Sequence, residues 1–120
     1  MSRVTRSVNA HKKRRRVLEE AKGYFGTKTS SYRKAKEQLL KSYGYMYRDR
    51  KTRKRDFRRL WIMRINAAAR QNGMSYNQFI HGLTAANIEL NRKMLADLAV
   101  DQPQVFAEIA GKAKEALAAS

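Results

Sequence analysis

The chain has 120 residues, which allows one ordinary domain or a small domain with an appendage. Its 27 Lys and Arg residues outnumber 10 Asp and Glu residues, and the resulting net charge of +17 favours polyanionic partners. The lack of cysteine excludes disulfides and thiolate metal sites, and no apolar run approaches the ~20 residues of a membrane span. Because the basic N-terminal segment has no apolar core, it does not read as a secretory signal, and we expect a soluble intracellular protein.

The positive charge is concentrated in the first half of the chain. Residues 1–60 carry 21 basic and 5 acidic side chains, a net +16, whereas residues 61–120 carry 6 and 5, a net +1. The first half cannot bury much surface, because its charges would leave water without gaining partners. We therefore predict a basic extension over residues 1–59 and a compact domain over residues 60–120.

The extension is expected to begin with a short helix and a bend. A helix is predicted from His11 to Lys22, and it contains the basic run at residues 12–16. Gly23 would end this helix, and the sequence GYFG at residues 23–26 predicts a bend whose two aromatic residues are either exposed or docked.

A single long helix is predicted to follow the bend. Residues 27–72 contain no proline and one glycine, Gly44, and Gly73 is placed to cap the C-terminal end. Such a helix would have about 45 residues and would span roughly 65–70 Å at 1.5 Å per residue. Thr27 or Thr29 would cap its start.

The central run of this helix, residues 48–59, reads RDRKTRKRDFRR and holds eight Arg or Lys residues and one apolar residue, Phe57. At 100° per residue these cations fall on every face, so no side is free to pack on a protein core. Like charges four residues apart also oppose the helix. We therefore expect the extension to be largely disordered alone and to become ordered on an anionic surface.

The second half has the pattern of a compact helical core. Apolar residues recur at steps of three and four from Phe57 through Leu60 to Ala68, which gives the last turns of the long helix an apolar face. Three further helices are predicted, with caps at Ser75, Asn91 and Asp101 and with Pro103 in the first turn of the last one. Their expected inward-facing residues are Tyr76, Phe79, Ile80, Leu83, Met94, Leu95, Leu98, Phe106, Ile109, Ala113 and Leu117. The predicted fold class is all-α, with a long basic N-terminal helical extension followed by a small compact C-terminal helical domain.

The composition of the extension favours nucleic acid, and RNA in particular, as its partner. Five of the six tyrosines lie there, and aromatic rings offer stacking surfaces for unpaired bases. Arg outnumbers Lys six to two in the central run, which suits bidentate recognition of phosphate. Cations on every face suit folded RNA, which can surround the helix, better than duplex DNA.

The positive charge of the extension is also compatible with roles that do not involve RNA. A charge run is ordinarily a solvated face, and the main functional alternative is an architectural DNA-binding protein. A cationic protein of the membrane surface would need an amphipathic helix with a clean apolar face, which the central run lacks.

A second anion site is suggested by Arg92 and Lys93. Both lie in the first turn of a predicted helix, where the helix dipole disfavours cations and a bound phosphate would reverse this penalty. Alternatively, both side chains extend into water. His81 is expected to be a surface or packing residue, and His11 to join the polar contacts of the basic run. Because the sequence shows no nucleophile–base pair, paired carboxylates or P-loop, we predict no catalytic residue, no metal site and no cofactor.

Several segments carry a resemblance to a known family. Within residues 47–70 the spacing of a long family signature is matched by Lys54, Arg58, Leu60, Trp61, Ile62, Arg64, Ile65, Asn66 and Arg70. Three other segments match further recurrent segments of the same family. They are GYFG after a basic run, FIHGL at residues 79–83 and LNRKMLADLA at residues 90–99. In these segments, and over essentially its whole length, the chain resembles the bacterial large-subunit ribosomal protein L-twenty family. The first 16 residues are a variable version of the family's N-terminal arm, and the alanine-rich tail after Lys114 is not diagnostic.

The resemblance implies a structural role in the ribosome rather than an enzymatic one. It implies direct binding of the large-subunit (23S) ribosomal RNA, a part in assembly of the large subunit, and a cytoplasmic location in that subunit. The implied partners are this RNA, neighbouring large-subunit proteins and, as in some members, the protein's own messenger RNA, with no membrane and no small-molecule substrate. Trp61 is expected to pack the long helix onto the compact domain. The expected RNA-binding residues are Arg3, Arg6, His11, Lys12, Lys13, Arg14, Arg15, Arg16, Lys22, Tyr24, Lys28, Tyr32, Arg33, Lys34, Arg48, Arg50, Lys51, Arg53, Lys54, Arg55, Arg58, Arg59, Trp61, Arg92 and Lys93.

Overall fold

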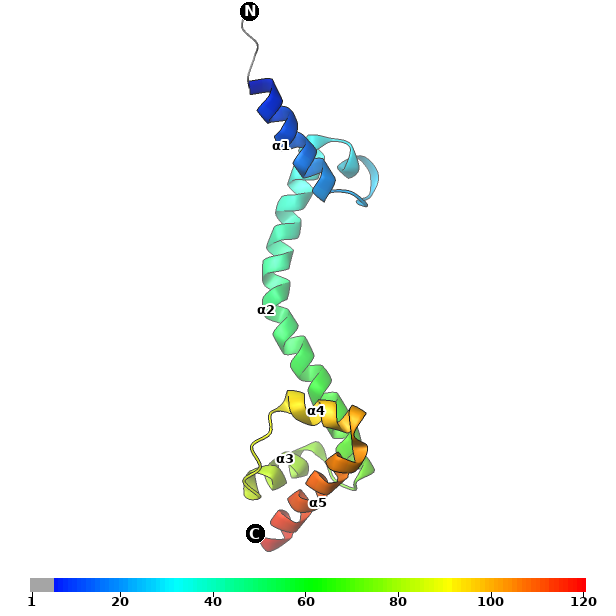
Figure 1. Ribbon diagram of the computed structural model, residues 1–120, viewed down its shortest axis with the longest axis vertical. Helices are drawn as coiled ribbons and strands as arrows, with labels where there is room; N and C mark the ends of the chain where they lie inside the picture. The colour runs from blue at the N-terminus through cyan, green and yellow to red at the C-terminus, as the bar shows by residue number, and fades with distance from the viewer. Residues whose placement is uncertain (1–5) are drawn as a thin grey trace, which may run out of the picture. The chain divides into compact units, whose positions relative to one another are not determined.

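The computed structural model describes residues 6–120, and within this range it contains α-helices, one 3₁₀ turn and no strand. The order is α1 (Arg6–Glu20), η1 (Gly26–Thr29), α2 (Tyr32–Gln71), α3 (Tyr76–Ala85), α4 (Arg92–Asp101) and α5 (Pro103–Ala119) (Figure 1). The all-α fold class, with one long helix ahead of several short ones, is confirmed. None of the helices described is long and apolar enough to span a membrane.

The described residues divide into two compact units, and the division falls inside α2, between Lys51 and Thr52. The first unit contains α1, η1 and the start of α2; the second contains the rest of α2 with α3, α4 and α5. The predicted boundary after Arg59 also lies in α2 and stays a prediction.

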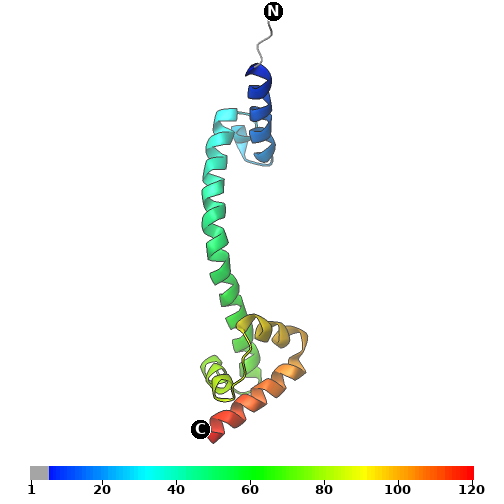
Figure 2. The ribbon, with the colours of Figure 1, turned by 60° about the vertical axis from the view of Figure 1, so that its left-hand side comes forward.

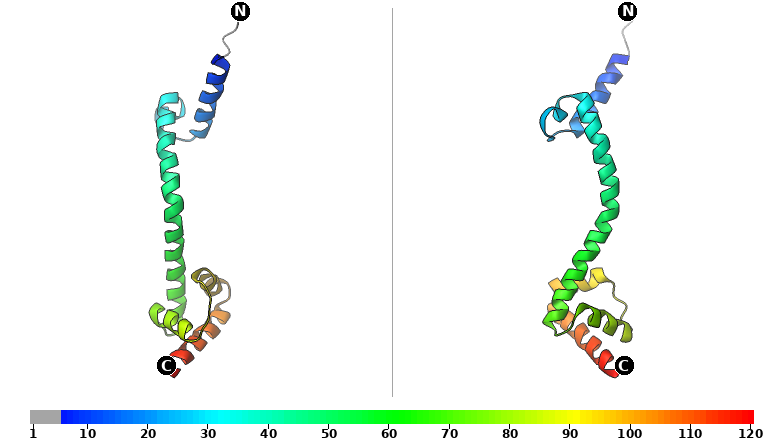
Figure 3. Two further views of the ribbon diagram at one scale, coloured as in Figure 1. Left: turned by 90° about the vertical axis from the view of Figure 1, so that its left-hand side faces the viewer. Right: turned by 180° about the vertical axis from the view of Figure 1, so that it is seen from behind.

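In the first unit, the short helix and the bend differ in position from the prediction. The helix α1 starts and ends earlier than the predicted span from His11 to Lys22. The chain then turns at Gly23, whose φ of +87° suits glycine, and η1 carries it to the start of α2 (Figure 3). Among the residues of this unit whose side chains are described, only Ala21, Ala35 and Leu39 are buried.

The predicted start of the long helix is wrong, because α2 begins at Tyr32 and not near Thr27. The preceding hydroxyl groups bond to local carbonyls: Thr29 Oγ1 donates to the Gly26 carbonyl at 3.1 Å and Ser30 Oγ to the Thr27 carbonyl at 3.5 Å. Such bonds compete with helix formation and favour a turn. The α2 helix is continuous through Gly44.

The second unit has one apolar core, formed by the last turns of α2 with α3, α4 and α5 (Figure 2). Helix α5 packs against both α3 and α4. The rings of Phe79 and Phe106 stack across α3 and α5 with centroids 5.0 Å apart. The buried members of this core are Ile65, Ala68, Ala69, Met74, Phe79, Leu83, Leu95, Ala96, Phe106, Ala110 and Ala113.

The helices α3 and α5 approach each other closely at Gly82. A Cβ atom built on Gly82 would lie 2.7 Å from the Ala113 carbonyl oxygen and 2.8 Å from the Ala113 Cβ. Side chains do not tolerate such distances, so glycine is required here for the two helices to pack.

Three predictions about the apolar face are wrong. Met94 is 51% exposed, because α4 turns Leu95 and Ala96 toward the core instead. Phe57 and Leu60 are 47% and 37% exposed, so the face of α2 that packs on the core of the second unit begins only at Trp61.

Most predicted helix ends of the second unit are confirmed. Gly73 has a φ of +77°, its amide bonds to the Arg70 carbonyl, and the next amide, of Met74, bonds to the Ala69 carbonyl; this is a Schellman motif. Ser75 forms a capping box with Gln78.

The start of α4 is also as predicted, but the start of α5 is not. Asn91 caps α4 by accepting a bond from the Met94 amide at 2.8 Å. Asp101 does not cap α5, because α4 continues through it and the break falls at Gln102, with φ −134° and ψ 71°. Pro103 follows as the first residue of α5 and disfavours a helical conformation at the residue before it.

Candidate nucleic-acid interface

The central run lies in the middle of α2, and all eight of its Arg and Lys residues are exposed. Its two carboxylates each contact one cation: Asp49 lies 3.2 Å from Arg48 Nε, and Asp56 lies 3.9 Å from Arg59 Nη1. In each pair both side chains are exposed to solvent, so the pair contributes only ~0.2–1 kcal/mol to stability. A polyanion that approached the helix could therefore compete with them easily.

Two exposed tyrosines lie beside cations at the N-terminal end of the central run. The Arg48 guanidinium is 4.7 Å from the centre of the Tyr45 ring, and the Lys51 ammonium is 4.5 Å from that of Tyr47. Both tyrosines are about half exposed, which leaves ring surface on which a base could stack beside the cation.

In the first unit, the structure brings together several of the predicted residues around one hollow of about 580 Å³. This His11 hollow is lined by His11, Arg14, Arg15, Leu18, Glu19, Lys22 and Thr29. Arg15 Nε lies 3.4 Å from Glu19 Oε1, four residues on, which holds one cation at the edge. The hollow combines three basic side chains with a histidine and suits a phosphate group.

Two of the predicted tyrosines pack inside the first unit. The Tyr24 hydroxyl lies 2.8 Å from the Ser42 Oγ, and the Tyr32 ring lies 5.8 Å from both the Arg14 guanidinium and the Lys36 ammonium. Their contacts hold the bend and α1 against the start of α2.

A third tyrosine adds a contact that the sequence did not indicate. The Tyr43 hydroxyl donates a hydrogen bond to Glu20 Oε2. This hydrogen bond, with the negative charge of Glu20, raises the pKa of the Tyr43 phenol above its ordinary value.

In the second unit, α2 and α4 together place four predicted residues around one groove of about 210 Å³. This Trp61 groove is lined by Arg58, Trp61, Asn91, Arg92 and Lys93. Arg92 Nε donates to the Tyr76 hydroxyl at 2.8 Å, which fixes the guanidinium over the groove. Three cations and an indole ring thus meet at the N-terminus of α4.

The remaining predicted residues are distributed along α1 and the start of α2. Exposed side chains on these helices belong to Lys12, Lys13, Arg16, Arg33 and Lys34, and Lys28 in η1 is half-buried. Arg6 is the first residue of α1, and only its backbone is described. Arg3 lies outside the described residues.

The sequence left open whether Phe25 is exposed or docked, and it gave no sign that Tyr76 contacts Arg92. Phe25 is 91% exposed and stands between Gly23 and Gly26, both with positive φ. The GYFG pattern was a usable signal for this residue. Tyr76 orients Arg92 from 16 residues away, and no local pattern reveals such a contact.

Comparisons with known proteins agree with the resemblance. The family described as Ribosomal protein L20 matches residues 3–109. The large ribosomal subunit protein bL20 of Rubrobacter xylanophilus is 58% identical over 117 residues, which cover 98% of this chain and 88% of that protein. The chain therefore belongs to the ribosomal protein L20 family.

Proposed function

We propose that this chain is a structural constituent of the large ribosomal subunit that binds the 23S ribosomal RNA directly and promotes subunit assembly. Membership of the L20 family, and the printed name of the relative from Rubrobacter xylanophilus, support the place in the large subunit. The observation that carries direct RNA binding is the central run, whose eight cations are all exposed around α2.

The proposed mechanism is neutralisation of phosphates that must lie close together in the folded RNA. Each Arg or Lys that contacts a phosphate releases condensed counterions, and this release drives binding. Arginine adds paired hydrogen bonds in a fixed geometry, which positions a phosphate as well as neutralising it. Cations on all sides of one helix would allow several RNA segments to be held at once.

The three basic surfaces and the aromatic residues have distinct proposed roles. The central run, the His11 hollow and the Trp61 groove bind phosphates, while Phe25 stacks on an unpaired base. Trp61 also holds the end of α2 on the core of the second unit. The protein's own messenger RNA, if it displays similarly crowded phosphates, would bind through the same surfaces, and no catalytic role is proposed.

The salt dependence of binding tests this proposal. For purified chain and folded 23S RNA, engagement of about ten phosphates predicts that log affinity falls with log salt at a slope of roughly −7 to −9. A slope near −2 would contradict a multi-phosphate interface. Duplex DNA titrated at the same salt concentration should bind more weakly, and equal or tighter binding would favour an architectural DNA-binding protein instead.

Co-sedimentation tests the place in the ribosome. The chain should sediment with large ribosomal subunits at moderate salt and should be released at high salt, because the contacts are mainly ionic. Sedimentation apart from large subunits at moderate salt would contradict the proposed location.

A further inference from the structure

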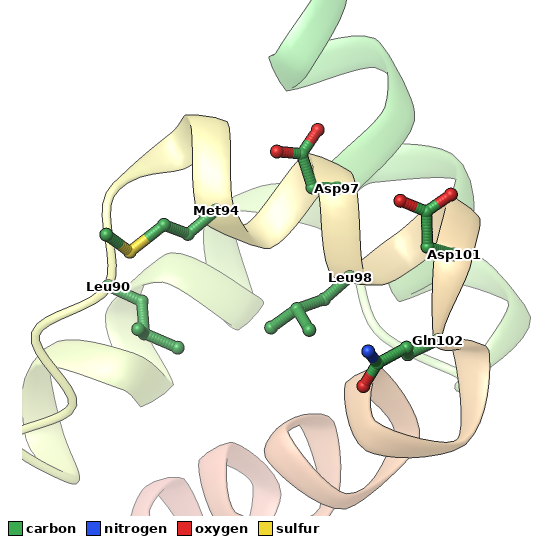
Figure 4. Close-up of a pocket in the computed structure, with 6 residues that line it drawn as sticks. All are labelled: Leu90, Met94, Asp97, Leu98, Asp101 and Gln102. Atoms are coloured by element: carbon green, nitrogen blue, oxygen red, sulfur yellow. The ribbon is translucent and has the colours of Figure 1, made fainter.

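The second unit has a groove that combines apolar side chains with two carboxylates, whereas the protein as a whole is strongly basic. This Leu98 groove, of about 360 Å³, lies at the junction of α4 and α5 and is lined by Leu90, Met94, Asp97, Leu98, Asp101 and Gln102. Figure 4 shows Asp97 and Asp101 on one side of α4, with the Leu98 side chain pointing away from both carboxylates. Met94 is 51% exposed, and Leu90 and Leu98 are half-buried.

The two carboxylates of this groove have no cation of their own. Among the described residues, 6–120, neither Asp97 nor Asp101 forms an ion pair, although the chain has 27 Lys and Arg. They lie four residues apart on one helix and therefore on the same face, so together they make the potential beside the groove more negative. Such a surface repels phosphate and attracts cations.

We propose that the Leu98 groove binds a cationic segment of a neighbouring ribosomal protein, one that carries an apolar side chain flanked by Lys or Arg. The proposal rests on the proposed function, because excess positive charge favours the binding of proteins to a shared, crowded polyanion. The apolar side chain contacts Leu90, Met94 and Leu98, and the flanking cations pair with Asp97 and Asp101. The methionine side chain is flexible, so Met94 can adjust to the shape of an incoming apolar side chain.

Charge complementarity favours a cationic protein segment over RNA as the occupant of this groove. RNA would bring phosphates next to two unpaired carboxylates, which is unfavourable. The RNA-binding surface and the protein-binding surface are thus distinguished by sign: three cations line the Trp61 groove, and two carboxylates line the Leu98 groove.

Site-specific photo-crosslinking in assembled large subunits tests the proposal. A benzophenone amino acid is placed at Met94 in the full chain, and the crosslinked peptide is identified by mass spectrometry. We expect a crosslink to a segment of another ribosomal protein with a net positive charge. The matched control carries the same group at Val100, which is 57% exposed on α4 but does not line the groove, and should give at least about a fivefold lower yield of that crosslink.

Charge variants complete the test. Asp97→Lys with Asp101→Lys should lower the Met94 crosslink about tenfold or more, since two favourable pairs become repulsive. The milder pair Asp97→Asn and Asp101→Asn should give an intermediate loss. All of these side chains are exposed, so the core of the second unit should be unaffected.

The outcomes distinguish this proposal from the function on which it rests. Co-sedimentation of the unlabelled chain with large subunits is measured first, and its failure would contradict the proposed function and this inference together. If the chain co-sediments but Met94 crosslinks to RNA, to a second copy of the chain or to nothing, the docking proposal alone is wrong. A crosslink that survives charge reversal of both aspartates also overturns it.

Discussion

The two units of this protein differ in what holds them together. Among the described residues, the first unit buries Ala21, Ala35 and Leu39, while the second buries eleven apolar residues, including Phe79 and Phe106. Burial of apolar side chains is the main favourable term that opposes the entropy lost when a chain becomes ordered. The second unit can therefore be stabilised by its own core. The first has little core to offset its ordering entropy or the repulsion of its charges.

The largest expected effect comes from reversing charge in the central run. Arg53→Glu, Arg55→Glu and Arg58→Glu together should weaken 23S RNA binding about a hundredfold or more and reduce the salt slope by roughly three. Helicity of the second unit should persist in circular dichroism, because all three side chains are exposed. Lys112→Glu with Lys114→Glu, on α5, serves as the charge-reversal control and should cost much less per residue changed. Loss of the fold of the second unit would show that the run is structural.

The dependence of the second unit on packing is tested at Gly82. Gly82→Ala should destabilise it by about 1–3 kcal/mol, because the added Cβ has no space against Ala113. The thermal midpoint of the helical signal should fall by roughly 4–8 °C per kcal/mol. Gly111→Ala is the matched control: apart from its chain neighbours and the backbone of α5 itself, nothing lies within 4 Å of the added Cβ, so that change should stabilise α5 slightly. Equal midpoints for the two variants would contradict the close approach of α3 and α5.

A smaller effect is expected at the bend of the first unit. Phe25→Ala should weaken RNA binding about tenfold through loss of one stacked base, with an unchanged salt slope because no charge is removed. Phe25→Trp, which keeps an aromatic face, should retain affinity. Wild-type binding by the alanine variant in the same titration would exclude the stacking role.

The smallest effect concerns the contact between Tyr43 and Glu20. The hydrogen bond raises the pKa of the Tyr43 phenol, so it stabilises the first unit below the ordinary phenol pKa of about 10 and is lost as pH rises through the raised value. Tyrosinate absorbance between about pH 9 and 12 should show one late-titrating tyrosine. Glu20→Gln should move that tyrosine to lower pH, and an unchanged titration curve would rule the contact out.

The local features of the fold were largely predictable from sequence. Ser75, Asn91 and Gly73 act within one helical turn of themselves, so their residue types reveal the helix ends. The start of α2 was not predictable in the same way, because hydroxyl groups of Thr29 and Ser30 serve a turn as well as they serve a helix cap. Periodicity also could not tell that α4 would expose Met94, because the direction of a helix face is set by its partners.

The sequence revealed which residue types form the candidate site, but it did not reveal which of those residues lie together in the fold. The central run is visible in twelve consecutive letters, but the Trp61 groove joins residues more than thirty positions apart in sequence. The Leu98 groove is built from residues close together in sequence, and it escaped notice for a different reason: its two carboxylates look ordinary until the fold leaves them unpaired beside apolar side chains. The expected disorder of the extension without a polyanion stays a prediction.

Helix α2 runs from Tyr32 to Gln71 and so contributes residues to both units, which divide at Lys51 and Thr52. Starting a helix is costly, by a factor of about a thousand, while adding a residue to an existing one is nearly neutral. The last turns of α2, anchored in the core by Ile65, can therefore act as a ready nucleus. If the extension is disordered without a polyanion, as predicted, neutralisation of the neighbouring cations would only have to lengthen that helix residue by residue toward the N-terminus. The folded second unit would then lower the barrier to ordering the extension.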